Sequence, residues 1–107
     1  MPRERFKTLT EQMFYILLCL DQECRGVDIL EMVRTVTVGR VSIGSGTLYD
    51  LLEQFLAEDM IRETKVEGRR RSYIITEKGR QMLDREYRRI RSQAADYEHM
   101  LQKGDSL

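Results

Sequence analysis

The sequence predicts a mainly α-helical fold with one small β-hairpin and a long helix at its C-terminal end. Three observations lead to this fold class. Within residues 1–57, apolar residues recur at helical spacing in short segments. "MIRETKVEGRRRSYIIT" then holds two β-rich stretches around a glycine. Residues 77–107 carry a heptad pattern, which is typical of a long helix that packs on another helix.

The first predicted helix lies in "TLTEQMFYILLCL". Thr8 and Glu11 have the spacing of a capping box, in which their side chains accept hydrogen bonds from free N–H groups at the helix start. The apolar positions that follow at helical spacing are Met13, Ile16, Leu17 and Leu20. We therefore expect a helix with one buried face.

The next segments predict a second helix and a brief strand. After the polar break "DQECRG", the segment "VDILEMVRTV" has Ile29, Leu30 and Val33 at helical spacing. The helix should stop in the β-branched residues that follow. "GRVSIG" alternates apolar and polar residues, and this alternation predicts a short strand.

A third helix is predicted to start near Ser45, whose hydroxyl can cap free backbone N–H groups. Gly44 and Gly46 keep the preceding turn sterically permissive. The apolar stripe of this helix consists of Leu48, Leu51, Leu52, Phe55 and Leu56. The residues that lie off the stripe, and so face outward, are Thr47, Tyr49, Asp50, Glu53 and Gln54.

The two β-rich stretches are separated by Glu67, Gly68 and Arg69, which predicts a hairpin with an arginine-rich tip. Three short helices followed by a hairpin make a winged helix-turn-helix domain, here residues 1–76. In that arrangement the third helix can enter the DNA major groove, while the hairpin, or wing, reaches the flanking backbone.

The charge distribution is compatible with a basic face on a neutral protein. The formal net charge is +0, with 18 basic and 18 acidic residues. Residues 1–60 hold six Lys and Arg against ten Asp and Glu, whereas residues 61–107 hold twelve against eight. Such an asymmetry suggests a local surface for an anionic partner. The densest basic run is Arg69, Arg70 and Arg71.

The chemistry of these residues predicts a division of labour on DNA. Arg69–Arg71 can only donate and carry permanent charge, so they suit phosphates. Thr47 and Tyr49 suit base edges or nearby phosphates, Gln54 could read adenine, and the N–H groups near Ser45 favour an anion. Two plainer interpretations stay open: a solvated arginine tip, and a Tyr49 that shields the edge of the core.

The C-terminal segment shows a heptad seam, consisting of Leu83, Tyr87, Ile90, Ala94, Tyr97 and Leu101. The predicted helix runs from about Glu77 to Gln102, and no comparable apolar surface remains in the first 75 residues to cover it. The simplest cover is the same helix of a second subunit, which makes residues 77–107 a dimerisation helix with a short tail. A helix that packs only on its own domain is the alternative, and Tyr87 and Tyr97 are then packing residues.

Other function classes find little support in the sequence. The longest apolar run, Met13–Leu20, is too short to span a bilayer, and no secretory signal is recognisable, so we expect a cytoplasmic protein without membrane contact. Cys19, Cys24 and the single histidine, His99, form neither a zinc set nor a redox pair. No catalytic constellation is visible, so we expect no enzyme, no metal and no cofactor. A winged-helix module that binds another protein instead of DNA is the main alternative.

Five segments together resemble the PadR family of transcriptional regulators, in its short subfamily with one terminal helix. They are "LTEQMFYILLCL", "GVDILEMV", "GSGTLYDLLEQFLAEDMI", "EGRRRSYIITEKGRQML" and the terminal helix itself. The resemblance implies a homodimeric winged-helix repressor that binds a palindromic operator. It also implies release by a small aromatic or cationic compound, for which Tyr97 and Ala94 offer a stacking ring and open space between paired helices.

The resemblance assigns roles to individual positions. It places Thr47 and Tyr49 among the DNA contacts of the recognition helix, and Gly68–Arg71 in the wing. The chain also departs from the family pattern. Many relatives carry a basic pair where this chain has Glu53 and Gln54, an aromatic residue is common at Val27, and Asp59 replaces a frequent glycine.

Overall fold

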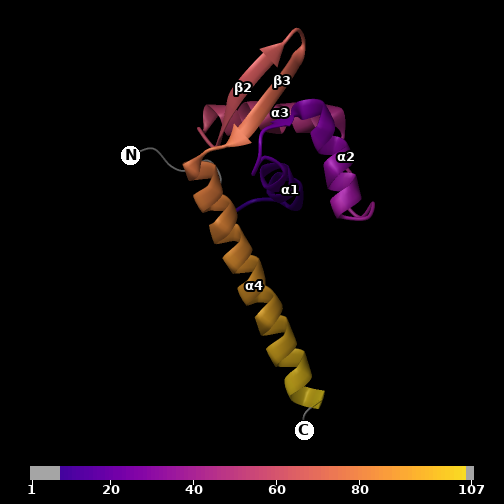
Figure 1. The fold of residues 1–107 in the computed structure, drawn as a ribbon. Coiled ribbons are helices and arrows are strands. Elements are labelled where there is room, and N and C mark those ends of the chain that lie inside the picture. The colour runs from indigo at the N-terminus through magenta and orange to yellow at the C-terminus, as the bar shows by residue number, and fades with distance from the viewer. Residues whose placement is uncertain (1–7, 106–107) are drawn as a thin grey trace.

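The computed structural model describes residues 8–105, and their side chains through residue 102. The elements in chain order are α1 (Glu11–Cys19), β1 (Cys24–Arg25), α2 (Gly26–Val36), α3 (Ser45–Ala57), β2 (Ile61–Glu67), β3 (Arg70–Ile75) and α4 (Glu77–Asp105). Within the described residues the fold is therefore four helices and one three-stranded antiparallel sheet (Figure 1). The predicted fold class, mainly helical with a small hairpin and a long C-terminal helix, is confirmed.

The sheet is built around β3, in the strand order β1-β3-β2. β2 and β3 form the predicted hairpin, with Ile61 opposite Ile75 and Glu67 opposite Arg70. Gly68 has φ 63°, a left-handed conformation that glycine adopts without steric cost, and it closes the turn. This hairpin, residues 61–75, is called the wing below, and its tip points away from α4 (Figure 1).

The hydrophobic core lies where the three short helices meet the sheet and the first turns of α4. The predicted stripes of α1, α2 and α3 all contribute buried side chains to it. The largest fully buried ones are Phe55, Ile16, Leu17, Leu20, Ile29, Leu48, Leu52, Met60 and Val33. Because one face of α3 is held in this core, its opposite face is turned to solvent.

Two local predictions for the segments before α3 were wrong. The N-cap of α1 is Thr10 and not Thr8: its hydroxyl accepts a hydrogen bond from the Met13 N–H at 3.2 Å, and its own N–H donates to the Met13 sulfur at 3.5 Å. Residues 39–44 form a loop and not a strand. The alternation of apolar and polar residues has a different cause: the side chains of Val41 and Ile43 are buried in the core. No strand of the described residues pairs with this loop.

Two residues of the "TEKG" segment, Thr76 and Gly79, have structural roles at the start of α4. The Thr76 hydroxyl donates to the Asp59 carbonyl at 2.6 Å and accepts from the Gly79 N–H at 3.1 Å, so it fastens α4 to the end of α3. A Cβ on Gly79 would clash with the backbone carbonyl of Met60. Asp59 has φ 58° and therefore adopts the left-handed conformation that favours glycine, the residue that the resemblance led us to expect here.

α4 is much longer than the domain against which it packs. One face of its first turns is buried, and Leu83 on this face is only 5% exposed. Beyond residue 86, every described side chain of the helix is exposed, and α4 projects from the rest of the molecule (Figure 1). This projection gives the chain extents of 63 × 40 × 22 Å.

Candidate nucleic-acid interface

A cleft of about 350 Å³ lies between the N-terminal half of α3, the start of α2 and the wing. Its lining residues, which define the cleft below, are Arg25, Val27, Tyr49, Glu53, Arg69, Arg70, Arg71 and Tyr73. Four of them are arginines, and they come from two separate parts of the chain. The fold thus adds Arg25 to the basic run 69–71 that the sequence already shows.

The start of α3 is open to solvent. Gly44 is the N-cap and Ser45 the first helical residue, and the N-cap makes no side-chain hydrogen bond. The predicted capping by the Ser45 hydroxyl is therefore wrong, because the helix starts one residue earlier than a serine cap requires. Ser45 and Thr47 are exposed, and the first N–H groups of the helix point toward a position where an anion is favoured.

Tyr49 stands partly out of the fold at the edge of the cleft, with 42% of its surface exposed. Its Cε1 atom would lie only 3.2 Å from a Cβ on Gly26, so the absence of a side chain there lets the ring lie close to the first turn of α2. The ring thus covers the start of α2, as the plainer interpretation of Tyr49 expects, and it also lines the cleft; its contact with DNA stays a prediction.

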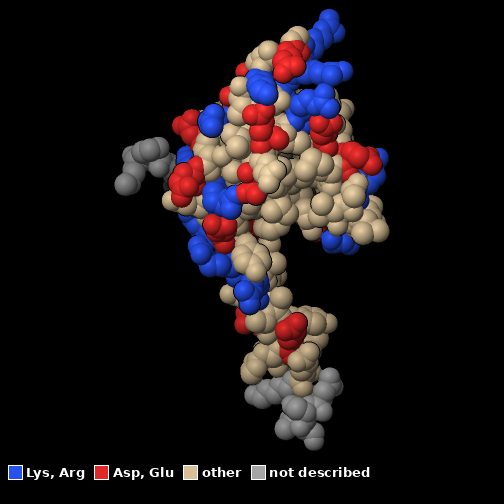
Figure 2. Space-filling view, in the orientation of Figure 1, with Lys and Arg blue, Asp and Glu red and all other residues tan. Residues whose placement is uncertain are grey.

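The wing supplies most of the positive charge. Arg71 forms an ion pair with Glu63 across the hairpin, with 3.5 Å between Nη1 and Oε2. Arg69 and Arg70 are exposed, and neither forms an ion pair with any residue in the range 8–102. Figure 2 shows Lys and Arg side chains gathered at the tip of the wing, with acidic groups interspersed both there and nearer to the helices.

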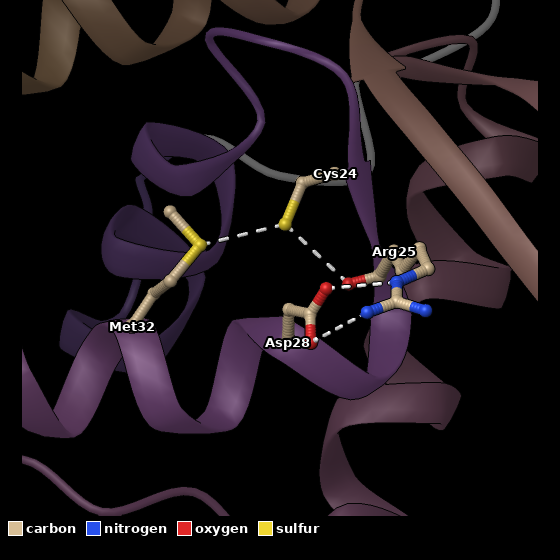
Figure 3. Close-up of polar contacts among 4 residues, drawn as sticks. All are labelled: Cys24, Arg25, Asp28 and Met32. Carbon is tan, nitrogen blue, oxygen red and sulfur yellow. Dashed lines mark hydrogen bonds and ion pairs between the residues drawn. The ribbon is translucent and has the colours of Figure 1, made fainter.

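Arg25 is a member of the cleft that the sequence did not reveal. It lies in β1, a two-residue strand that exists only because Cys24 pairs with Tyr73 and Arg25 with Ser72 of β3. The Arg25 Nε donates to the Asp28 carboxylate at 2.9 Å, and this bond holds the guanidinium at the start of α2 (Figure 3). The only sequence signal was its position just before a helix start.

Acidic groups limit this basic surface. Glu53 lines the cleft together with the arginines. Burial is the main cause of the raised pKa of Tyr73, and the charge of Glu53 contributes to it. Gln54 is half-buried, and its amide donates to the Asp50 carboxylate at 2.9 Å. Gln54, which the sequence assigns to base reading, is therefore already engaged within α3, whereas Thr47 is exposed.

The predicted seam of α4 divides into two parts. Leu83 is buried in its own chain. The remaining positions are exposed and are called the exposed seam below: Tyr87, Ile90, Ala94, Tyr97 and Leu101. A groove of about 580 Å³, the α1–α4 groove, runs beside them and is lined by Phe14 and Tyr15 of α1 as well as by Ile90, Ala94 and Tyr97.

Glu86 fixes α4 beside α1 at the inner end of this groove. Its carboxylate is 4% exposed and accepts a hydrogen bond from the Arg89 Nε at 2.9 Å. The Arg89 hydrogen bond lowers the pKa of Glu86, and a further bond from the Leu9 backbone acts in the same direction. The contact with Leu9 ties α4 to the chain segment that precedes α1.

Among the described residues, no three His, Cys, Asp or Glu side chains gather in a group that could hold a metal ion. In the same part of the chain, none of the helices has both the length and the apolar character needed to cross a bilayer.

Comparison with known proteins agrees with this geometry. The family model described as "Transcriptional regulator PadR-like family" matches residues 16–85. No curated protein matches the chain. Among solved structures, RosR of H. salinarum is similar with a TM-score of 0.69 and 16% identity, covering 94% of this chain and 96% of that one. The complex structure of hsRosR-S4 gives a TM-score of 0.68 at 16% identity, with 94% and 92% covered.

A transcriptional regulator from Clostridium thermocellum is also similar, with a TM-score of 0.59, 21% identity, and coverage of 88% of this chain and 86% of that one. Identities this low establish a common fold and no more. The family match is independent of them and includes α2, α3, the wing and the first turns of α4. The chain therefore belongs to the PadR-like family of transcriptional regulators.

Proposed function

We propose that the protein represses transcription as a homodimer that binds a palindromic DNA operator. The cleft carries this proposal, because it brings Arg25 and the wing arginines beside the outward face of α3. In a winged helix of this kind, α3 enters the major groove and the wing follows the backbone. Residues 1–76 then hold the DNA, and residues 77–107 join the two subunits.

Each part of the cleft has a role that follows from its chemistry. The exposed Arg69 and Arg70 neutralise phosphates, and the open N-terminus of α3 with Ser45 receives another phosphate. Thr47 and Tyr49 contact base edges, and Gly68 gives the wing its tight turn. Most of the affinity for DNA is thus independent of the DNA sequence, and the selectivity among DNA sequences comes from α3.

The exposed seam supports dimerisation. Ile90 is 41% exposed and Tyr97 67% exposed in the single chain, and an isolated helix with such a stripe leaves apolar surface in water. Pairing α4 with its copy buries these residues, and Ala94 permits a close approach of the two backbones. A two-fold dimer places its recognition helices on half-sites about one helical turn, roughly 34 Å, apart.

The α1–α4 groove supports a role for a small effector. It is largely apolar, has about 580 Å³, and combines the Phe14, Tyr15 and Tyr97 rings with the small Ala94. A flat aromatic compound that stacks on Tyr97 would lie against the paired α4 helices. It would thereby alter the distance between the clefts of the two subunits. We propose that such a compound releases the protein from its operator.

The experiment that tests the function is selection of bound duplexes from a random DNA library with the purified protein, followed by titration at several salt concentrations. We expect an inverted repeat to be enriched, and an affinity for the selected duplex that falls steeply as salt rises. A transcription reaction on a template that carries the selected site should then yield less transcript. Failure to enrich any duplex would refute DNA binding and favour the protein-binding alternative, which the exposed Asp50 and Glu53 on α3 would suit.

The effector is tested separately. A library of aromatic compounds is screened for a shift in melting temperature, and hits are repeated with Tyr97→Ala. A compound that stabilises the wild type, loses its effect on Tyr97→Ala and weakens operator binding supports the proposal. If hits act equally on both proteins, Tyr97 has no part in an effector site.

A further inference from the structure

α3 contributes two side chains to the lining of the cleft, Tyr49 and Glu53, and both are exposed. They are four residues apart, so they lie on the same face of the helix. At about 1.5 Å per residue, they are separated by about 6 Å along the helix axis. When α3 turns this face to the base edges of DNA, Glu53 brings a carboxylate into the same groove as the Tyr49 ring.

The carboxylate of Glu53 is not neutralised by the arginines of the cleft. The Arg25 guanidinium is held by Asp28, with 2.9 Å between Nε and Oδ2 (Figure 3). Arg71 pairs with Glu63 across the hairpin at 3.5 Å. Within residues 8–102, Glu53 itself forms no ion pair. Its lone pairs are therefore available to a partner that enters the cleft.

Glu53 differs in its hydrogen-bonding chemistry from the other polar side chains on the outward face of α3. The Gln54 amide donates to the Asp50 carboxylate at 2.9 Å, so these two residues are engaged with each other. Thr47 and Tyr49 carry hydroxyl groups, which can both donate and accept. An ionised carboxylate can only accept. The group on DNA that satisfies Glu53 must therefore be a donor.

The base edges of the major groove present few donors. Guanine offers only the N7 and O6 acceptors, and thymine offers the O4 acceptor and a methyl group. Adenine has its N6 donor beside the N7 acceptor, which would face the second carboxylate oxygen. Cytosine presents its N4 amino group as a donor, and a glutamate accepts from it. Because a desolvated carboxylate without a donor is costly, cytosine is the base that fits Glu53.

The phosphate backbone repels the same carboxylate, since both carry negative charge. The other charged groups that line the cleft are arginines, and phosphates attract these. Glu53 is thus the one charged group of the cleft lining whose contact with DNA is unfavourable unless an amino group faces it. A group of this kind penalises the wrong DNA sequences and so contributes selectivity instead of affinity.

We propose that Glu53 selects one cytosine in each operator half-site by accepting a hydrogen bond from its N4 amino group, a role that rests on the proposed function. Successive base pairs are about 3.4 Å apart, so the separation of about 6 Å between Tyr49 and Glu53 corresponds to about two base pairs. The selected cytosine should lie within that distance of the base pair that Tyr49 contacts.

The experiment is selection from a random duplex library with four proteins: the wild type, Glu53→Gln, Glu53→Ala and Glu77→Gln. Glu77→Gln is the matched control, because Glu77 is exposed at the start of α4 and does not line the cleft. The wild type and the control should enrich the same half-site, with cytosine at one position. Glutamine pairs with adenine N6 and N7, so Glu53→Gln should change the preference there to adenine, and Glu53→Ala should accept any base.

Titration measures the size of the effect. The selected duplex is compared with one in which this cytosine is replaced by adenine in both half-sites. The wild type should bind the selected duplex at least about fivefold more tightly, the low end for one base contact, and Glu53→Ala should bind both duplexes equally. Loss of the negative charge tightens binding to every duplex, so the ratio of the two affinities is the quantity to compare. Circular dichroism of each variant shows that it is folded.

The outcomes separate this role of Glu53 from the proposed function. If the wild type enriches a half-site and both Glu53 variants enrich the same bases at every position, cytosine selection is refuted while DNA binding stands. Uniform tightening on all duplexes in those variants would then show that Glu53 acts only on phosphates. A wild-type preference for another base at the position that Glu53→Ala relaxes also contradicts the proposal. Absence of any enrichment by the wild type refutes the proposed function and cytosine selection together.

Discussion

Replacement of Arg70 by glutamine is the change that tests the cleft most directly. The Arg70 side chain is exposed at the tip of the wing and forms no ion pair with residues 8–102, so its charge is available to a phosphate. Arg71 differs, because Glu63 already neutralises part of its charge. We therefore expect Arg70→Gln to weaken binding to selected and random duplexes alike, and Arg71→Gln to have a smaller effect.

The magnitude follows from the symmetry of the dimer. One arginine lost per subunit removes two phosphate contacts, so the slope of log K against log salt should fall by about 1.8, at about 0.9 for each phosphate. Between about 50 and about 200 mM salt, the affinity ratio of wild type to Arg70→Gln should consequently shrink about tenfold. The loss is largest at low salt, where released counterions contribute most.

The assay is fluorescence anisotropy with one labelled selected duplex and one random duplex at several salt concentrations. Arg88→Gln is the matched control, because Arg88 is an exposed arginine of α4 that lies outside the exposed seam and far along the chain from the cleft. It removes the same charge and should leave the slope close to that of the wild type. An Arg70→Gln slope equal to the wild-type slope, with DNA binding retained, would refute the assignment of Arg70 to a phosphate.

Three further changes test other parts of the molecule. Ile90→Asp forces a charge into the proposed dimer interface and should yield monomers in sedimentation velocity; a dimer of unchanged stability would remove Ile90 from the interface. Thr47→Ala should reduce discrimination between selected and random duplexes by about 1–3 kcal/mol for a lost base contact, and equal losses on both duplexes would instead mean a phosphate contact. Glu86→Gln should lower the melting temperature at neutral pH. The lowered pKa of Glu86 means that its contribution is fully present above the ordinary glutamate pKa of about 4.3 and is lost as the pH falls through the folded-state pKa, so the two melting temperatures should converge in acid. A difference that stays constant down to low pH would show that the carboxylate charge is not responsible.

The sequence by itself determined the elements whose signals are local. The stripe from Leu48 to Phe55 is a property of α3 alone, since burial of one helical face requires apolar residues at that spacing wherever the partner surface comes from. The wing was predictable for the same reason: two β-rich stretches around Gly68 need only each other to form hydrogen bonds. Arg69–Arg71 and Thr47 could thus be placed correctly on the tip and on the outward face of α3.

Only the tertiary structure decided the features that depend on contacts between distant segments. β1 has two residues and no local signal, yet it forms because β3 presents a free edge, whereas residues 39–44 alternate but find no edge to pair with. The same pairing brings Arg25 to the cleft. Leu83 continues the heptad pattern but is buried by its own domain, because the first turns of α4 cover the core before the helix leaves it. A pattern along the chain shows which side chains need cover, and only the packed structure shows which surface provides it.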